Sequence, residues 1–168
     1  YIPKAFFNRK QIESLSGVYF PYWIYDATVK GKLAGEAKKI RIWRSGDVEY
    51  TETKFYQVER DGVVDIKGMT ANALKKANVK LLNGVLPYNL KEMKDFNMGY
   101  LSGFLAEKRD IEKETVEPEL TSVMKQTAEN LMRNTVSGYN AVTVNHMGLL
   151  PQNEKWSYVL LPVWTVTY

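Results

Sequence analysis

The sequence contains no cysteine and a single histidine, His146. The absence of cysteine excludes disulfide bonds, thiolate metal ligands and a cysteine nucleophile within these 168 residues. A zinc or iron site would therefore need mainly carboxylate ligands, which is uncommon for zinc. A cysteine-free chain also suits a reducing compartment, so we expect a cytoplasmic location and no metal or other cofactor.

Long apolar runs are missing as well. No stretch approaches the roughly 18 to 20 apolar residues that cross a bilayer, so we expect no membrane span. The segment that begins at Tyr1 lacks the charged opening and small-residue cleavage site of a signal peptide. An excess of one charge is nearly absent too, since 23 basic and 19 acidic residues leave a net charge of +4. Such a balance permits an anionic partner but does not require one.

Aromatic residues, by contrast, are abundant. They make up 12% of the chain, with 11 tyrosines and 4 tryptophans, which favours sheets and large packing areas over a helical bundle. The 45% hydrophobic and 25% charged content is typical of a globular protein. The length suits one well-buried core and is short for two domains, so we expect a single domain over residues 1–168.

The first part of the sequence predicts an antiparallel β-meander. Runs rich in β-branched and aromatic residues cover residues 17–29, 36–44 and 48–60. Two short glycine-containing turns, Lys30-Gly31-Lys32 and Ser45-Gly46-Asp47, separate them. The third run ends at a further turn signal, Asp61-Gly62.

The middle of the sequence predicts helices. Residues 70–78 suit a short helix, and the apolar spacing predicts a second helix over residues 95–108. Glu117-Pro118-Glu119 indicates the start of a long amphipathic helix, which Gly138 ends. Its core-facing stripe is predicted to contain Leu120, Val123, Met124, Ala128, Leu131 and Val136.

Two closing strands, residues 139–145 and 155–168, complete the predicted α+β fold. The last strand repeats a signature of the first, because Pro21-Tyr22-Trp23 and Pro162-Val163-Trp164 lie at the same offset in two apolar runs. This echo suggests two related half-units in which Trp23 and Trp164 are both buried. The alternative is convergence between two apolar strands of similar composition.

Five segments in the same order resemble a known group of proteins. The resemblance is carried by Ile2-Pro3-Lys4-Ala5-Phe6, by Ser16 to Trp23, by Gly46-Asp47 with Tyr50-Thr51-Glu52-Thr53, by Tyr100 to Lys108 and by Tyr158 to Trp164. Along essentially the whole chain they resemble uncharacterised bacterial proteins that contain a transcription-factor-IIB-type zinc ribbon. The resemblance implies that cysteine-rich ribbons precede this region in the parent protein and that the chain is an excised core. Some of these relatives carry helicase labels, but this chain has no phosphate-binding Gly-x-x-x-x-Gly-Lys-Ser/Thr loop.

Isolated polar residues offer weak signals of catalysis. Asp26, Asp47 and Glu52 could form a carboxylate site if they converged, yet turns favour Asp and strands expose Glu for structural reasons. His146 could act as a general base, but a lone histidine is more often a surface or packing residue. Ser102, Ser137 and Ser157 lack the context of a nucleophile elbow. Gly99, Gly103 and Ala106 would form a smooth helix face for close packing on the sheet.

The most basic part of the chain alternates cations with an aromatic residue on a predicted strand. It consists of Lys38, Lys39, Arg41, Trp43 and Arg44, with Lys30 and Lys32 nearby. Such a strand could follow a phosphate backbone and stack a base. The alternative is a solvated sheet face whose charges prevent aggregation.

These observations favour a non-enzymatic binding or scaffold module of a larger zinc-ribbon protein, with an unidentified protein partner. Nucleic-acid binding through Lys38, Lys39, Arg41, Trp43 and Arg44 is the alternative hypothesis. A hydrolase-like enzyme with carboxylates near Asp26 comes third.

Overall fold

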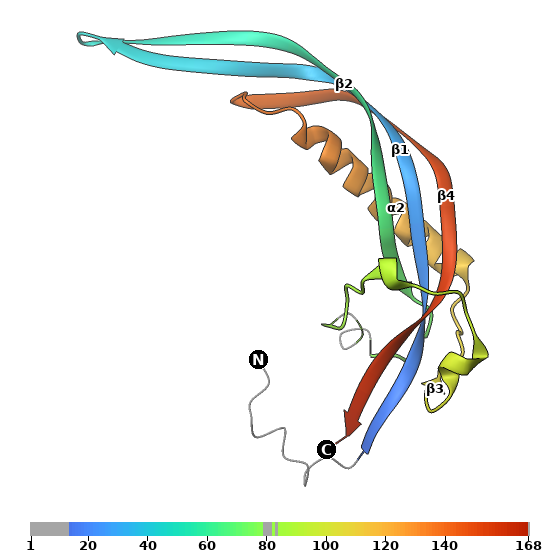
Figure 1. Ribbon diagram of the computed structural model, residues 1–168. Coiled ribbons are helices and arrows are strands. Elements are labelled where there is room, and N and C mark those ends of the chain that lie inside the picture. The colour runs from blue at the N-terminus through green and yellow to red at the C-terminus, as the bar shows by residue number, and fades with distance from the viewer. Residues whose placement is uncertain (1–13, 79–81, 83, 168) are drawn as a thin grey trace. The chain divides into compact units, whose positions relative to one another are not determined.

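The computed structural model describes residues 14–78, 82 and 84–167, which form long strands and a long α-helix (Figure 1). The strands are β1 (Ser14–Ser45), β2 (Val48–Asn72), the two-residue β3 (Leu105–Ala106) and β4 (Ala141–Thr167). The helix α2 spans Lys113–Asn134, and two 3₁₀ turns, η3 (Leu90–Glu92) and η4 (Met98–Leu101), precede β3. No helix in the described part of the chain is long and apolar enough to cross a membrane. The predicted α+β class is confirmed.

The sheet is mixed, and β1 is its central strand. Among the described residues β1 pairs with β2, β3 and β4. The pairing with β3 is parallel and places Val18 beside Leu105 and Tyr19 beside Ala106. The prediction of a purely antiparallel meander is therefore wrong, because a short segment that is distant in sequence adds to β1 in parallel.

Two predicted turns lie inside strands. Lys30-Gly31-Lys32 belongs to β1, and Asp61-Gly62 belongs to β2, so two long strands replace three short ones. Gly31 has a packing role, since a Cβ there would lie 2.8 Å from the Met132 sulfur of α2. The two predicted closing strands are likewise one strand, β4.

Two predicted helices are absent from the described residues. Residues 70–72 end β2, and the segment that follows them is irregular as far as residue 78. Residues 95–108 contain η4 and β3 instead of a helix. The Asn97 side chain accepts a hydrogen bond from the Gly99 amide, and Gly103 has a positive φ of 80°. This local turn chemistry interrupts the helical pattern, so Gly99, Gly103 and Ala106 do not share a helix face.

The long helix α2 is confirmed, but it begins at Lys113 and contains Pro118. In the second unit its buried residues are Leu120, Met124, Ala128 and Met132, and Val136, two residues past the end of the helix, is buried as well. Val123 and Leu131 are 43% and 45% exposed, so the prediction that they face the sheet is wrong. The buried residues are spaced by four, a row that runs obliquely along the helix, as packing on a twisted sheet favours.

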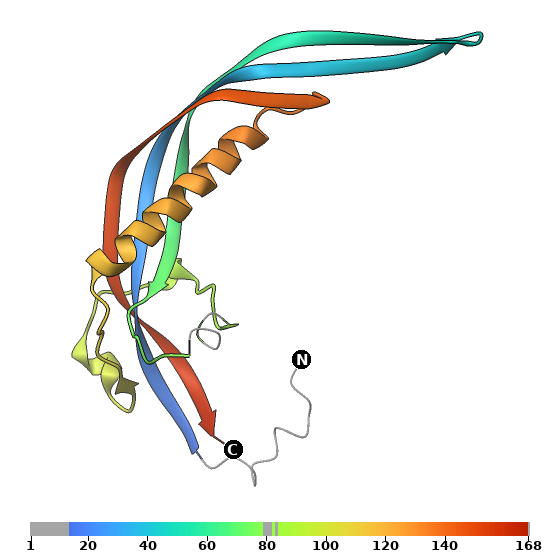
Figure 2. The same ribbon diagram turned by 180° about the vertical axis from the view of Figure 1, so that it is seen from behind.

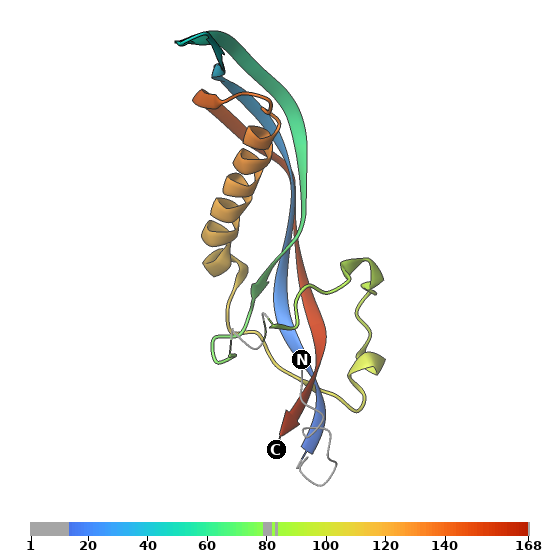
Figure 3. The ribbon, with the colours of Figure 1, turned by 90° about the vertical axis from the view of Figure 1, so that its left-hand side faces the viewer.

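The chain packs as two compact units. Among the described residues, the first contains the chain up to Ile24, Thr70–Glu117 and the chain from Trp156, and the second contains Tyr25–Met69 and Pro118–Lys155. In the second unit α2 lies against one face of β1, β2 and β4 (Figures 2 and 3). Its core cluster consists of Leu33, Ala37, Val58, Met132 and Val136. In the first unit the described residues form one cluster of Tyr22, Leu82 and Leu161 and another of Trp23, Ala73 and Val116.

The two tryptophans of the repeated signature have different environments. Trp23 is buried, whereas Trp164 is 64% exposed and contacts the ring of Phe104. The prediction that both are buried is wrong, and with it the interpretation of two related half-units loses its basis.

Candidate functional site

The hairpin end of β1 and β2 extends past the strand β4. The Asn140 amide donates to the Lys38 carbonyl at 2.8 Å, and the Ile40 amide donates to the Asn140 side chain at 2.7 Å. Beyond this point β1 and β2 pair with each other alone among the described residues and form a two-stranded ribbon, residues 38–55 (Figure 1). Its turn has Gly46 at a φ of 62° in the first central position, as a type II′ turn requires.

Cross-strand contacts fix the register of the ribbon and separate its two faces. Lys38 lies over the Phe55 ring at 5.2 Å, and Arg44 pairs with Glu49 at 3.0 Å, which defines one face. Trp43 stacks on Tyr50 with 5.5 Å between ring centroids, which defines the other face. Because side chains alternate along a strand, Ile40 and Ile42 join the first face and Lys39, Arg41, Glu52 and Lys54 join the second.

Both faces of the ribbon are open to solvent, since none of residues 38–55 is buried. Large apolar side chains contribute to each face, and their exposed fractions lie between 40% and 66%. They are Ile40, Ile42, Trp43, Val48, Tyr50 and Phe55. The sequence-based prediction covered the β1 half of the ribbon and missed the β2 half. The signal is present, because apolar residues occupy both faces of two β-prone runs that a single short turn joins.

The predicted nucleic-acid-binding residues all lie on the ribbon, but on different faces. Lys38 and Arg44 are on the Phe55 face, and Lys39, Arg41 and Trp43 are on the Tyr50 face. Arg44 is already paired with Glu49. The Arg41 guanidinium lies 5.5 Å from the Trp43 ring, which also stacks on Tyr50 at an interplanar angle of 13°. The indole is therefore partly covered by its own neighbours.

The three candidate carboxylates do not come together. Asp26 accepts a hydrogen bond from the Gly68 amide at 2.7 Å and so links β1 to β2. Asp47 lies in the hairpin turn, and Glu52 pairs with Lys54 at 3.5 Å. His146 is an exposed residue of β4. In the described part of the chain no three histidine, aspartate or glutamate side chains are grouped so that they could hold a metal ion.

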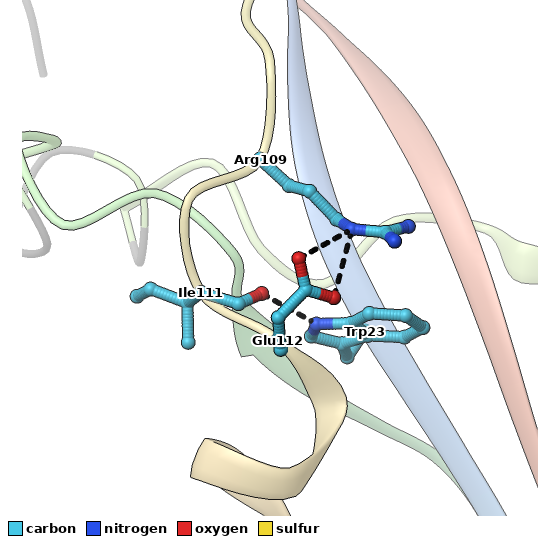
Figure 4. Close-up of polar contacts among 4 residues, drawn as sticks. All are labelled: Trp23, Arg109, Ile111 and Glu112. Atoms are coloured by element: carbon cyan, nitrogen blue, oxygen red, sulfur yellow. Dashed lines mark hydrogen bonds and ion pairs between the residues drawn. The ribbon is translucent and has the colours of Figure 1, made fainter.

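The first unit contains a cluster of aromatic and charged side chains that the sequence did not predict (Figure 4). The Trp23 indole donates to the Ile111 carbonyl at 3.0 Å. The Arg109 guanidinium lies 5.2 Å from the Trp23 ring and 5.0 Å from the Tyr158 ring, and it pairs with Glu112 at 3.2 Å. The cation is thus held by two rings and a carboxylate, an arrangement that fastens the segment before α2 to β1. Its residues are far apart in sequence, so no local pattern could have found them.

A groove of about 830 Å³ also lies in the first unit. Its aromatic lining residues are Tyr19, Tyr88, Phe96, Tyr100 and Tyr158. The Tyr88 hydroxyl donates to the Pro162 carbonyl, which attaches the segment before η3 to β4. Burial raises the pKa of Tyr88 and of Tyr158, and the neighbouring Arg109 opposes that rise at Tyr158. The groove is mainly apolar, and among the described residues that line it Glu92 is the single acidic side chain, so no pair of acids faces the groove.

The chain is a distant homologue of the uncharacterised protein YdjG of Bacillus subtilis (strain 168). The two are 30% identical over 166 residues, which cover 99% of this chain and 49% of YdjG. The chain thus spans about half the length of this bacterial relative. No protein-family model matches the chain, and no solved structure matches it significantly.

Proposed function

We propose that the chain is a non-enzymatic binding module of a larger cytoplasmic protein and that the ribbon is its contact surface for a partner protein. The observation that supports this most is the set of large apolar side chains exposed on both faces of residues 38–55. Contiguous exposed apolar surface is a feature of interaction sites. A two-stranded ribbon is also marginally stable by itself, so a partner that covers it would add stability. The cytoplasmic location rests on the cysteine-free composition.

The charges on the ribbon define the chemistry of the proposed partner. Five basic and three acidic side chains lie within residues 38–55. Glu49 and Glu52 pair with Arg44 and Lys54, whereas no ion pair involves Lys38, Lys39 or Arg41 among the described residues. The partner surface should therefore be apolar at its centre, with acidic side chains at the rim.

Nucleic-acid binding is the second candidate, and the cations at Lys38, Lys39 and Arg41 favour it. A base could stack on Trp43, but it would compete with Tyr50 and Arg41, which already contact the indole. We therefore place the protein partner first. Asp26, Asp47 and Glu52 lie apart, so the hydrolase-like alternative has no group of acids to support it. The association with zinc ribbons in the parent protein also remains a proposal and rests on the resemblance of the five motifs.

Paired substitutions test the ribbon as a protein contact. In the full-length parent protein, the double change Ile42→Thr/Phe55→Thr keeps β-propensity and removes apolar surface from one face. The control is Val63→Thr, because Val63 is 62% exposed, close to Ile42 at 59%, and lies outside the ribbon.

A partner is first identified by co-purification with the wild-type protein, and its Kd is then measured for each variant. We expect the double change to raise the Kd at least about tenfold, as loss of interface anchors does. The control should change the Kd less than about twofold. Equal Kd values for both variants would refute the ribbon as the contact. A partner that is a nucleic acid, lost when Lys39 and Arg41 are changed to Gln, would put the second candidate first.

A further inference from the structure

The outer edge of β4 in the second unit has no strand beside it. Among the described residues β4 pairs with β1 alone, so the opposite edge of the strand has no backbone partner in the sheet. Residues 141–150 form the first part of this edge, and they contain no lysine, arginine, aspartate, glutamate or proline. We refer to residues 141–150 as the β4 edge.

The other edge strand of this unit is protected by charge. Within Val48–Met69, β2 contains eight charged residues: Glu49, Glu52, Lys54, Glu59, Arg60, Asp61, Asp65 and Lys67. Charged side chains on an edge strand discourage the addition of a further strand. The β4 edge lacks that protection over ten residues, and Val142 and Leu150 on it are 39% and 59% exposed.

The chemistry of the β4 edge indicates what can cover it. A row of backbone N–H and C=O groups is matched by another extended strand. Because the edge has no lysine, arginine, aspartate or glutamate, it does not select an oppositely charged segment, and such side chains do not repel each other when two copies meet. Two ten-residue strands paired antiparallel about a two-fold axis would share about ten hydrogen bonds, a number typical of a protein interface. We propose that two copies of the chain associate through the β4 edges, which pair antiparallel and continue the sheet from one copy into the other.

The test is sedimentation equilibrium of the 168-residue chain, with hydrogen exchange measured on the same samples. The double variant Thr143→Lys/Asn145→Lys adds two cations to exposed positions of the β4 edge. The matched control Thr51→Lys/Thr53→Lys adds the same charge at exposed positions of β2. Circular dichroism melts of all three proteins establish that each is folded.

We expect the wild-type chain and the control to dimerise with similar Kd values, and the β4 variant to raise the Kd about 100-fold or more, since like charges face each other across the two-fold axis. Amide exchange over residues 141–150 should slow as the wild-type concentration rises, because outward N–H groups enter hydrogen bonds. A folded wild-type chain that stays monomeric would overturn the proposal. So would a dimer that the β4 variant leaves intact, or one that only the β2 control abolishes.

Discussion

The Tyr22 hydroxyl is buried in the first unit and has no hydrogen-bond partner among the described residues. Tyr22 is 1% exposed and packs with Leu82 and Leu161. Burial raises its pKa, and the neighbouring Tyr88 adds to the rise. An unpaired buried hydroxyl lowers the stability of the folded state, because the group has given up its hydrogen bonds to water.

The change Tyr22→Phe removes this hydroxyl and keeps the ring. We expect the free energy of unfolding at pH 7 to stay the same or to rise by up to about 1 kcal/mol. The effect on pH dependence follows from the raised pKa. Above pH ~10 the unfolded chain loses the Tyr22 proton while the folded chain retains it, so wild-type stability is complete below that pH and falls above it. Denaturant unfolding at pH 7 and above pH ~10 should show a smaller alkaline loss for the variant than for the wild type. A marked loss of stability at pH 7 would contradict this account.

At the scale of the elements, the close approach of β4 and α2 to β1 in the second unit depends on glycines of β1. A Cβ at Gly35 would lie 2.2 Å from the Thr143 carbonyl oxygen of β4, and backbone cannot rotate away. A Cβ at Gly31 would meet the Met132 side chain, which is flexible. A Cβ at Gly62 would meet nothing within 4 Å.

The three Gly→Ala changes should therefore differ in a fixed order. We expect Gly35→Ala to lower the free energy of unfolding by about 1–3 kcal/mol or more, as overpacking does. Gly31→Ala should lower the free energy of unfolding by less. Gly62→Ala should raise it by up to about 1 kcal/mol, because alanine loses less conformational entropy than glycine when the chain folds. Urea unfolding measures all three. Equal costs at Gly35 and Gly62 would mean that β4 does not approach β1 as described.

Glycine positions also explain why the sequence could not predict the strand boundaries. A glycine between β-prone runs indicates a turn at Gly46, and that prediction is confirmed. At Gly31 and Gly62 the same signal lies inside a strand, since glycine also serves where another element comes close or where space is open. Local pattern alone cannot separate these cases, so two long strands were predicted as three short ones.

The helix shows a second limit of local pattern. The apolar residues of α2 include neighbours, Val123 with Met124 and Leu131 with Met132, and either member of a pair fits a helical stripe. The structure buries both methionines and exposes Val123 and Leu131. Which member of each pair is buried depends on how the oblique row of side chains packs against the sheet, and that packing is a tertiary property.

At the scale of the whole molecule, the α+β class followed from composition and periodicity, whereas contacts between distant segments did not. The basic residues of the candidate site were found as one run in β1. Their separation onto two faces, and their contacts with Glu49, Tyr50 and Phe55, depend on the hairpin register. The Arg109 cluster and the parallel pairing of β3 join residues more than 80 positions apart and have no local signal.

The central claim is that the ribbon contacts a protein, and site-specific photo-crosslinking in the native host tests it most directly. A photo-crosslinking amino acid replaces Ile42 in the full-length parent protein, and in a control it replaces Val63, which is similarly exposed outside the ribbon. Crosslinked products are treated separately with protease and nuclease and identified by mass spectrometry. We predict a discrete adduct with one protein from position 42 and none from position 63. A nuclease-sensitive adduct at position 42, or identical products from both positions, would contradict the claim.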